Sequence, residues 1–348
     1  MHPYAVMALA ALAALGTTAL LGYVFIPWLH KLKFGQMILD IGPNWHKHKQ
    51  GTPTMGGVMF ISGILLAVLA AFLTDALLGG RQLLADGFKS ENTASKLVAG
   101  IIMAALFGLM GFLDDYVKHV KKQNQGLTIV QKSLMQIPIS IGYLLSLWLA
   151  MGRQPYTLIP FVGQVNLSWF YWFFGFAVIY ATVNTANFTD GLDGLCSGVT
   201  LVGGAGFVVF AVLRGMFGVG VVAAAVMGGC AGFLIWNRNP AKVMMGDTGS
   251  NFLGGLMVAV SFALDCPVIL LLMCVIYVIE GLSDVIQIGY FKLTHGKRIF
   301  KMAPIHHHFE MSGWSEKKID IVFSLINLAG AAAGIAVVWY GLKAFIRT

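Results

Sequence analysis

The chain has 348 residues, of which 57% are hydrophobic and only 11% are charged, and its mean hydropathy is +0.77. Soluble domains carry about 25% charged residues, so this composition excludes an ordinary soluble domain and a disordered chain. The formal net charge of +8 is too sparsely distributed for a nucleic-acid-binding face. It is typical of a membrane protein whose basic residues gather on one side, and we expect no nucleic-acid partner.

Ten apolar segments, some of them short, follow one another along the chain, and a membrane-spanning helix needs about 20 such residues. Because backbone polar groups in lipid must be hydrogen-bonded internally, we expect these segments to be helices. The sequence therefore predicts one all-α polytopic membrane domain over residues 1–348, with about ten transmembrane helices and four free, buried cysteines. The segments are Tyr4–Trp28, Met55–Leu77, Leu97–Leu113, Ile129–Met151, Phe170–Ala186, Leu195–Leu213, Gly218–Trp236, Phe252–Leu264, Pro267–Tyr290 and Ile319–Leu342.

Lysine and arginine are unevenly distributed over the connections. With ten spans, both termini lie on one side of the membrane and the odd-numbered connections lie on the other. Those connections hold 15 of the 23 Lys and Arg residues, so the positive-inside rule places them in the cytoplasm and both termini outside. Most acidic residues lie near the same cytoplasmic ends, and acids at the ends of apolar spans indicate a functional site.

Two adjacent carboxylates, Asp114 and Asp115, close the third span. Neighbouring carboxylates repel one another, and the helix dipole disfavours them at a C-terminus. They therefore need compensating cations, which Lys118 or a divalent metal ion could provide. The alternative is a solvated turn at the membrane interface.

Two further connections combine carboxylates, amides and glycines. Residues 184–194 include Asn187, Asp190 and Asp193, which could bind sugar hydroxyls, a base or a hard cation. Residues 237–251 include Asn237 and Asp247, and Asp247 comes just before a span, where a helix N-terminus favours phosphate groups. In both connections, the alternative is that the polar residues only cap the next helix.

The long basic connection near the C-terminus ends in His306, His307 and His308. Successive side chains of a helix lie about 100° apart, so three consecutive histidines cannot face one metal ion. Imidazoles that contact phosphates fit this run better than a zinc site does, and a solvated polar loop is the alternative. In the ninth span, Glu280 and Asp284 share a helix face, where they either line a polar cavity or pair with a cation.

Carboxylates from several connections are thus expected on one membrane face, together with lysines, histidines and the turn Gly51–Gly57. Mg²⁺ prefers carboxylates together with substrate phosphate oxygens, and it neutralises the charge on a diphosphate leaving group. The residues therefore predict phosphoryl transfer at the cytoplasmic membrane surface, with a lipid acceptor reached from the bilayer.

The motifs at 51–57, 114–115, 187–194, 237–250 and 303–310 occur in this order over nearly the whole chain. They closely resemble those of the bacterial phospho-N-acetylmuramoyl-pentapeptide transferases, a branch of the polyprenyl-phosphate N-acetylhexosamine-1-phosphate transferases. The resemblance implies Mg²⁺-dependent transfer of phospho-MurNAc-pentapeptide from UDP-MurNAc-pentapeptide to undecaprenyl phosphate, giving lipid I and UMP for peptidoglycan synthesis. It also implies a homodimer of multi-pass subunits in the bacterial plasma (inner) membrane, with the active site facing the cytoplasm.

The resemblance also implies roles for individual residues. Asp247 would bind Mg²⁺, and Asp114 would deprotonate the lipid phosphate with Asp115 beside it. His306 and His307 would act at the sugar or phosphate region. The expected substrate-binding residues are Lys118, Lys132, Asn187, Asp190, Asp193, Asn237 and His308, with Lys47 and Lys49 as further candidates for anion contact.

Two alternatives to this function and two mechanisms stay open at the level of sequence. A relative that transfers GlcNAc-1-phosphate would share most motifs, although the histidine run argues against it. A transporter would also contain intramembrane acids, but it should place them near the midplane rather than at one face. For the transfer itself, direct attack by the lipid phosphate is favoured over a covalent aspartyl intermediate.

Overall fold

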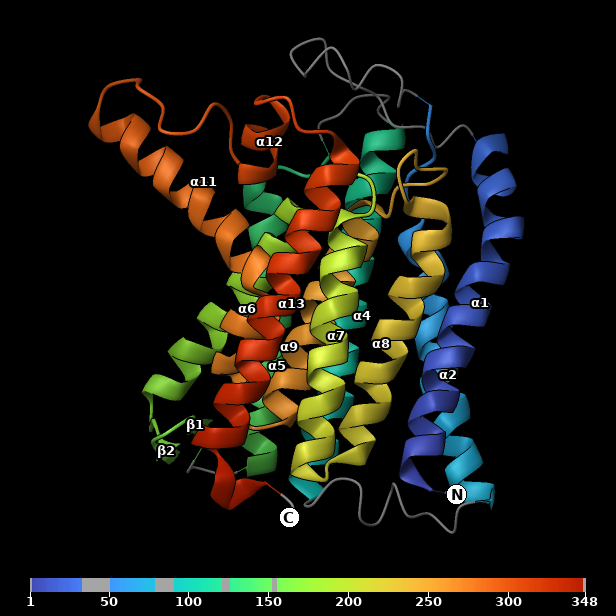
Figure 1. Cartoon of the computed structure of the whole chain (residues 1–348), viewed down its shortest axis with the longest axis vertical. Coiled ribbons are helices and arrows are strands. Elements are labelled where there is room, and N and C mark those ends of the chain that lie inside the picture. The colour runs from blue at the N-terminus through green and yellow to red at the C-terminus, as the bar shows by residue number, and fades with distance from the viewer. Residues whose placement is uncertain (1, 33–50, 79–90, 121–125, 152–154, 347–348) are drawn as a thin grey trace.

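Figure 1 shows the computed structural model, which describes residues 2–32, 51–78, 91–120, 126–151 and 155–346. All ten predicted apolar segments correspond to helical regions, which confirms the predicted helical elements. The principal helices are α1 (Pro3–Lys31), α2 (Gly57–Leu78), α4 (Glu91–Val120), α5 (Ile129–Met151), α6 (Phe170–Thr189), α7 (Leu195–Arg214), α8 (Phe217–Asn237), α9 (Gly246–Ala263), α11 (Val275–Leu293), α12 (Ile305–Glu310) and α13 (Glu316–Gly341).

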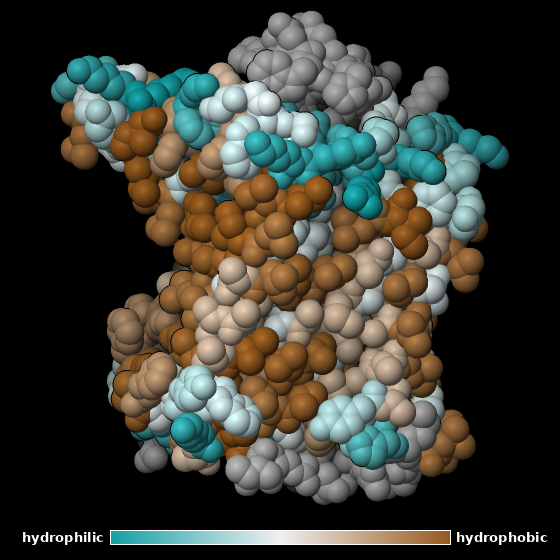
Figure 2. Space-filling view, viewed as in Figure 1, coloured by the Kyte–Doolittle hydropathy of each residue, from teal (hydrophilic) through white to brown (hydrophobic). Residues whose placement is uncertain are grey.

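Seven of the described helices are long and apolar enough to cross a membrane, or eight spans if one bent pair is counted as a single span. Figure 2 shows apolar surface across the middle of the bundle and hydrophilic residues gathered toward its ends. Large side chains such as Leu77 and Leu149 are 80% and 70% exposed, which suits a lipid environment better than water. The chain is therefore a multi-pass, mostly helical membrane protein. Helices α6 and α9 are not among the seven, so a total of ten spans stays a prediction.

The ninth predicted span is broken rather than continuous. It begins with two short pieces, η2 (Pro267–Ile269) and α10 (Leu270–Met273), and α11 then runs at 88° to them and leaves the bundle (Figure 1). Inside a membrane, backbone groups freed by such a break need partners. Asn327 of α13 is fully buried and supplies them: its amide nitrogen donates to the Met273 carbonyl at 3.0 Å, and its oxygen accepts from the Ile276 amide at 3.3 Å.

A small hairpin also departs from the purely α-helical prediction. Strand β1 (Tyr156–Ile159) pairs antiparallel with β2 (Gly163–Asn166) between α5 and α6. The segment is short and lies between two apolar spans, so its strand character gave little signal in the sequence. The Leu158 amide donates to the Asp265 carbonyl at 2.7 Å, which ties the hairpin to the turn after α9.

Asp265 belongs to a buried charge cluster near the hairpin. Its carboxylate lies 2.5 Å from the Lys96 ammonium of α4 and 3.6 Å from the Arg214 guanidinium at the end of α7. The exposed fractions of Lys96, Asp265 and Arg214 are 2%, 6% and 6%. Two cations therefore share one carboxylate away from water.

Helix α9 forms the centre of the bundle, because every residue from Thr248 to Ala263 is buried. Two of its glycines allow neighbouring helices to approach closely. An added Cβ would lie 2.9 Å from the Ala104 backbone of α4 at Gly255, and 2.8 Å from the Val183 backbone of α6 at Gly254. This packing sets the start of α9 directly against the end of α4.

The two ends of the bundle differ in character. Figure 1 shows both termini at one end and α12 at the other, as the alternation of spans predicts. The end of α4 and the start of α9, which carry the predicted aspartates, lie at the end opposite the termini. The predicted free cysteines are also confirmed, since Cys196, Cys230, Cys266 and Cys274 are all unpaired and buried.

Candidate active site

Three carboxylates from two helices meet at this end of the bundle. Asp114 and Asp115 lie near the end of α4, Asp247 lies in the first turn of α9, and one oxygen from each lies within 4.8 Å of the others. Two glycines make the approach possible. An added Cβ on Gly111 would lie 2.1 Å from the Asp247 carbonyl oxygen, and one on Gly246, which has a left-handed φ of 72°, would lie 2.5 Å from the Asp115 carboxylate.

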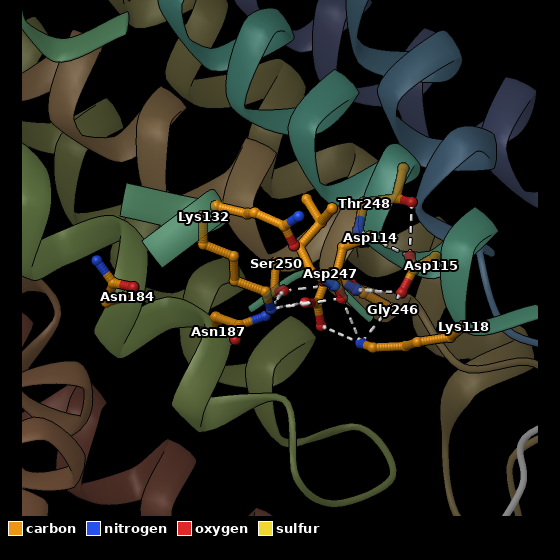
Figure 3. Close-up of polar contacts among 12 residues, drawn as sticks. Asp114, Asp115, Lys118, Lys132, Asn184, Asn187, Gly246, Asp247, Thr248 and Ser250 are labelled. Carbon is orange, nitrogen blue, oxygen red and sulfur yellow. Dashed lines mark hydrogen bonds and ion pairs between the residues drawn. The ribbon is translucent and has the colours of Figure 1, made fainter. Parts of the chain in front are cut away.

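Two lysines lie among these carboxylates (Figure 3). The Lys118 ammonium is 2.6 Å from Asp114 and 3.3 Å from Asp247. The Lys132 ammonium, from α5, is 2.6 Å from Asp247 and 3.4 Å from Asp114. Side chains of α4, α5 and α9 thus form one charged cluster in the structure, and the roles expected of these five residues stay predictions.

The two adjacent aspartates have different surroundings. Asp115 accepts hydrogen bonds from the amides of Asp247 and Thr248 at 3.2 and 3.0 Å, and from the Thr248 hydroxyl at 2.7 Å. It therefore caps the N-terminus of α9 from a neighbouring helix. Asp114 instead accepts from the Leu127 amide at 2.7 Å and faces both lysines. The side chain of Asp247 is the most accessible of the three, at 15% exposed against 1% for Asp114 and 4% for Asp115.

The predicted residues of the 184–194 connection lie beside this cluster. The side-chain amide of Asn187 donates to the Ser250 hydroxyl of α9 at 2.9 Å (Figure 3). Asp190 follows the end of α6, and burial, reinforced by the charges of Asp247 and Asp115, raises its pKa well above the usual range for an aspartate. An additional cation near Asp190 would favour its ionised form.

Asp193 and Asn237 join the connections to one another. Asp193 accepts from the Asn239 side chain and the Ala241 amide, both at 3.0 Å. Asn237 is 1% exposed, and its side chain accepts from the Gly194 amide at 3.1 Å and donates to the Val243 carbonyl at 2.9 Å. Both side chains hold loops together in this structure, so their expected contacts with the nucleotide sugar stay predictions.

The three histidines have different polar partners, although the rings of His306 and His307 lie 4.1 Å apart, centroid to centroid. His306 is fully buried with its Nδ1 3.1 Å from Glu280, His307 has its Nδ1 3.0 Å from Glu310, and His308 accepts from the Lys301 amide. An added Cβ on Gly191 would lie 2.2 Å from His306. The histidine helix therefore packs on the turn that carries Asp190 and Asp193. His306 has no exposed surface in this structure, and the expected action of His306 and His307 at the sugar or phosphate region stays a prediction.

Several contacts of this site were not assigned from the sequence. Thr248, Ser250 and Asn239 each bond a predicted site residue, although the sequence assigns them no individual role. Their positions in the sequence do not show which residues of other segments they contact. Lys47 and Lys49, the further candidates for anion contact, lie outside the described residues.

Comparisons with known proteins show the family of the chain. Residues 97–265 match the model of Glycosyl transferase family 4, and residues 49–61 match the phospho-N-acetylmuramoyl-pentapeptide-transferase signature 1. A protein named phospho-N-acetylmuramoyl-pentapeptide-transferase from Listeria welshimeri is 45% identical over 316 residues, covering 90% of this chain and 93% of the relative. One of the same name from Desulforamulus reducens is 42% identical over 338 residues, covering 94% and 96%. The chain belongs to the family of phospho-N-acetylmuramoyl-pentapeptide transferases.

Proposed function

We propose that this enzyme transfers phospho-MurNAc-pentapeptide from UDP-MurNAc-pentapeptide to undecaprenyl phosphate, giving lipid I and UMP for peptidoglycan synthesis. Membership of the family supports this reaction. The structural observation that carries it is the cluster of Asp114, Asp115 and Asp247 with Lys118 and Lys132 at one end of a membrane bundle. Such a cluster suits a polyanionic substrate that meets a lipid acceptor.

The donor set of this cluster fits a magnesium ion. Mg²⁺ prefers carboxylate oxygens and substrate phosphates, and the three carboxylates converge within 4.8 Å. Two ammonium groups oppose three carboxylates. The site therefore has an excess of acidic groups over cations. Asp247, the most accessible of the three carboxylates, would hold the ion, which would supply positive charge to the substrate diphosphate and to the departing UMP.

In the proposed reaction, an oxygen of the lipid phosphate attacks the sugar-linked phosphorus. A new P–O bond forms there, and the bond from that phosphorus to the bridging oxygen breaks, so UMP leaves with the electron pair. Asp114 would accept the proton of a protonated lipid phosphate. Lys118 and Lys132, whose ammonium groups already face this point, would hold phosphate oxygens as the charge redistributes.

We further propose that the site faces the cytoplasm of a bacterial inner membrane, with both termini outside, and that the enzyme is a homodimer of ten-span subunits. The distribution of Lys and Arg supports the orientation, because 15 of 23 lie in connections on the site side. The placement of the termini at the opposite end of the bundle agrees with an even number of spans.

The test is UMP release by purified protein with undecaprenyl phosphate and either UDP-MurNAc-pentapeptide or UDP-GlcNAc, with and without Mg²⁺. The proposal expects Mg²⁺-dependent release, coupled to lipid product, only with the muramoyl substrate. Asp247→Ala should abolish release, whereas Asp75→Asn, which changes a carboxylate near the far end of α2, should not.

Release with UDP-GlcNAc alone would assign the sister reaction. No release from folded protein would refute the proposal, and ion flux would then test for a transporter. UMP release without lipid would favour a covalent intermediate over direct attack.

A further inference from the structure

The turn Gly51–Gly57 has no role in the proposed chemistry, yet it touches the chain directly before Asp247. Three main-chain hydrogen bonds join the two segments. The Met244 amide donates to the Pro53 carbonyl at 2.8 Å, the Gly56 amide donates to the Met244 carbonyl at 2.9 Å, and the Gly57 amide donates to the Met245 carbonyl at 3.0 Å. The last of these bonds ends only two residues before Asp247.

The same two segments also meet at a pair of glycines. An added Cβ on Gly57, at the start of α2, would lie 2.5 Å from both the Cα and the amide nitrogen of Gly249. In return, an added Cβ on Gly249 would lie 3.0 Å from the Gly57 Cα, 2.9 Å from the Met245 side chain and 2.7 Å from the ring of Phe60. Gly249 follows Asp247 by two residues. The clash at Gly57 involves backbone atoms, so no side-chain rotation can relieve it.

Asp247 is therefore fixed on two sides. On one side, its amide donates to Asp115 of α4 at 3.2 Å. On the other, Gly56 and Gly57 bond the backbone of residues 244 and 245, and Gly57 packs on Gly249, two residues after Asp247. The buried Met55, with a left-handed φ of 66°, turns the chain so that both glycine amides point at the 244–245 carbonyls.

We propose that the Gly56–Gly57 segment is a positioning element that fixes the Asp247 carboxylate relative to Asp114 and Asp115. It acts through the backbone of residues 244–249 and does not itself contact substrate. This inference rests on the proposed function, because the segment is proposed to support cation binding and turnover at that same site. A displacement of a reacting group by about 1 Å can cost about 100-fold in rate.

The test compares Gly57→Ala with Gly142→Ala, which is also in a helix but has no atom within 4 Å of the added Cβ. Turnover and KM are measured by UMP release. Binding of Mn²⁺, used as a paramagnetic substitute for Mg²⁺, is measured by EPR without substrate. For Gly57→Ala we expect turnover to fall about 100-fold, and Mn²⁺ affinity to fall about 10-fold, as for altered supporting residues of metal sites. Gly142→Ala should match the wild type in both.

A second variant keeps the test decisive if Gly57→Ala does not fold. Gly249→Ala creates a milder clash, chiefly with side chains, and should shift Mn²⁺ affinity and turnover in the same direction. Wild-type Mn²⁺ affinity and turnover in folded Gly57→Ala, or in Gly249→Ala if it must be used instead, would overturn the inference and leave the proposed function intact. Lost turnover with unchanged Mn²⁺ affinity would also overturn it. A wild type that neither binds Mn²⁺ nor releases UMP would instead refute the proposed function.

Discussion

Asp265→Asn should destabilise the protein without changing its chemistry. The carboxylate compensates two buried cations, with Lys96 at 2.5 Å and Arg214 at 3.6 Å. Asp265 has a left-handed φ of 61°, a conformation that asparagine also tolerates, so the substitution removes charge with little backbone strain. Leaving a buried charge without its partner costs about 3–5 kcal/mol, and we expect a loss of this size.

The assay is reversible unfolding in mixed micelles, with UMP release measured at a temperature where the variant is folded. Folded Asp265→Asn should retain wild-type turnover, because the cluster lies beside the hairpin rather than at Asp247. The double variant Lys96→Met/Asp265→Asn should recover part of the lost stability, since one unpaired cation is removed with its buried desolvation cost. Wild-type stability of Asp265→Asn, or a double variant less stable than the single one, would refute this reasoning.

Three further variants test the site and the bend. Asp115→Ala leaves the amides at the start of α9 without their acceptor, so stability should fall by about 1–3 kcal/mol and UMP release should fall sharply; unchanged stability would contradict the capping role. Gly111→Ala should lower turnover at least about 10-fold, because its Cβ would meet the Asp247 backbone at 2.1 Å, whereas Gly16→Ala, with open space around it, should not. Asn327→Leu should speed hydrogen–deuterium exchange of the α11 amides after the break, and unchanged exchange would show that Asn327 does not hold the bend.

The sequence predicted the helical segments and the gathering of acidic motifs at one end of the bundle. Both follow from local properties, namely long apolar runs and charges at their ends. The pairing of Asp114 with Lys118 could also be predicted from the sequence, because the two residues lie one helical turn apart. The roles of the site residues in the reaction stay predictions.

What the sequence could not show depends on contacts between distant residues. The break at Cys274 lies in a continuous apolar run, and the side chain that satisfies it, Asn327, is more than fifty residues away. The cap of α9 by Asp115 similarly needs the packing of α4 on α9. The histidine run predicted either phosphate contacts or a solvated loop, and it could not show the burial of His306, which depends on Glu280 and Gly191 from two other elements.

The burial of all four native thiols has a practical consequence. A membrane-impermeant maleimide reacts with accessible thiols, so the native chain should give little background labelling in intact cells. Single cysteines introduced near Trp314, beside α12, or at Phe161, in the hairpin loop, would then report which end of the bundle faces the outside. The orientation of the enzyme becomes measurable in its own membrane without first removing any natural cysteine.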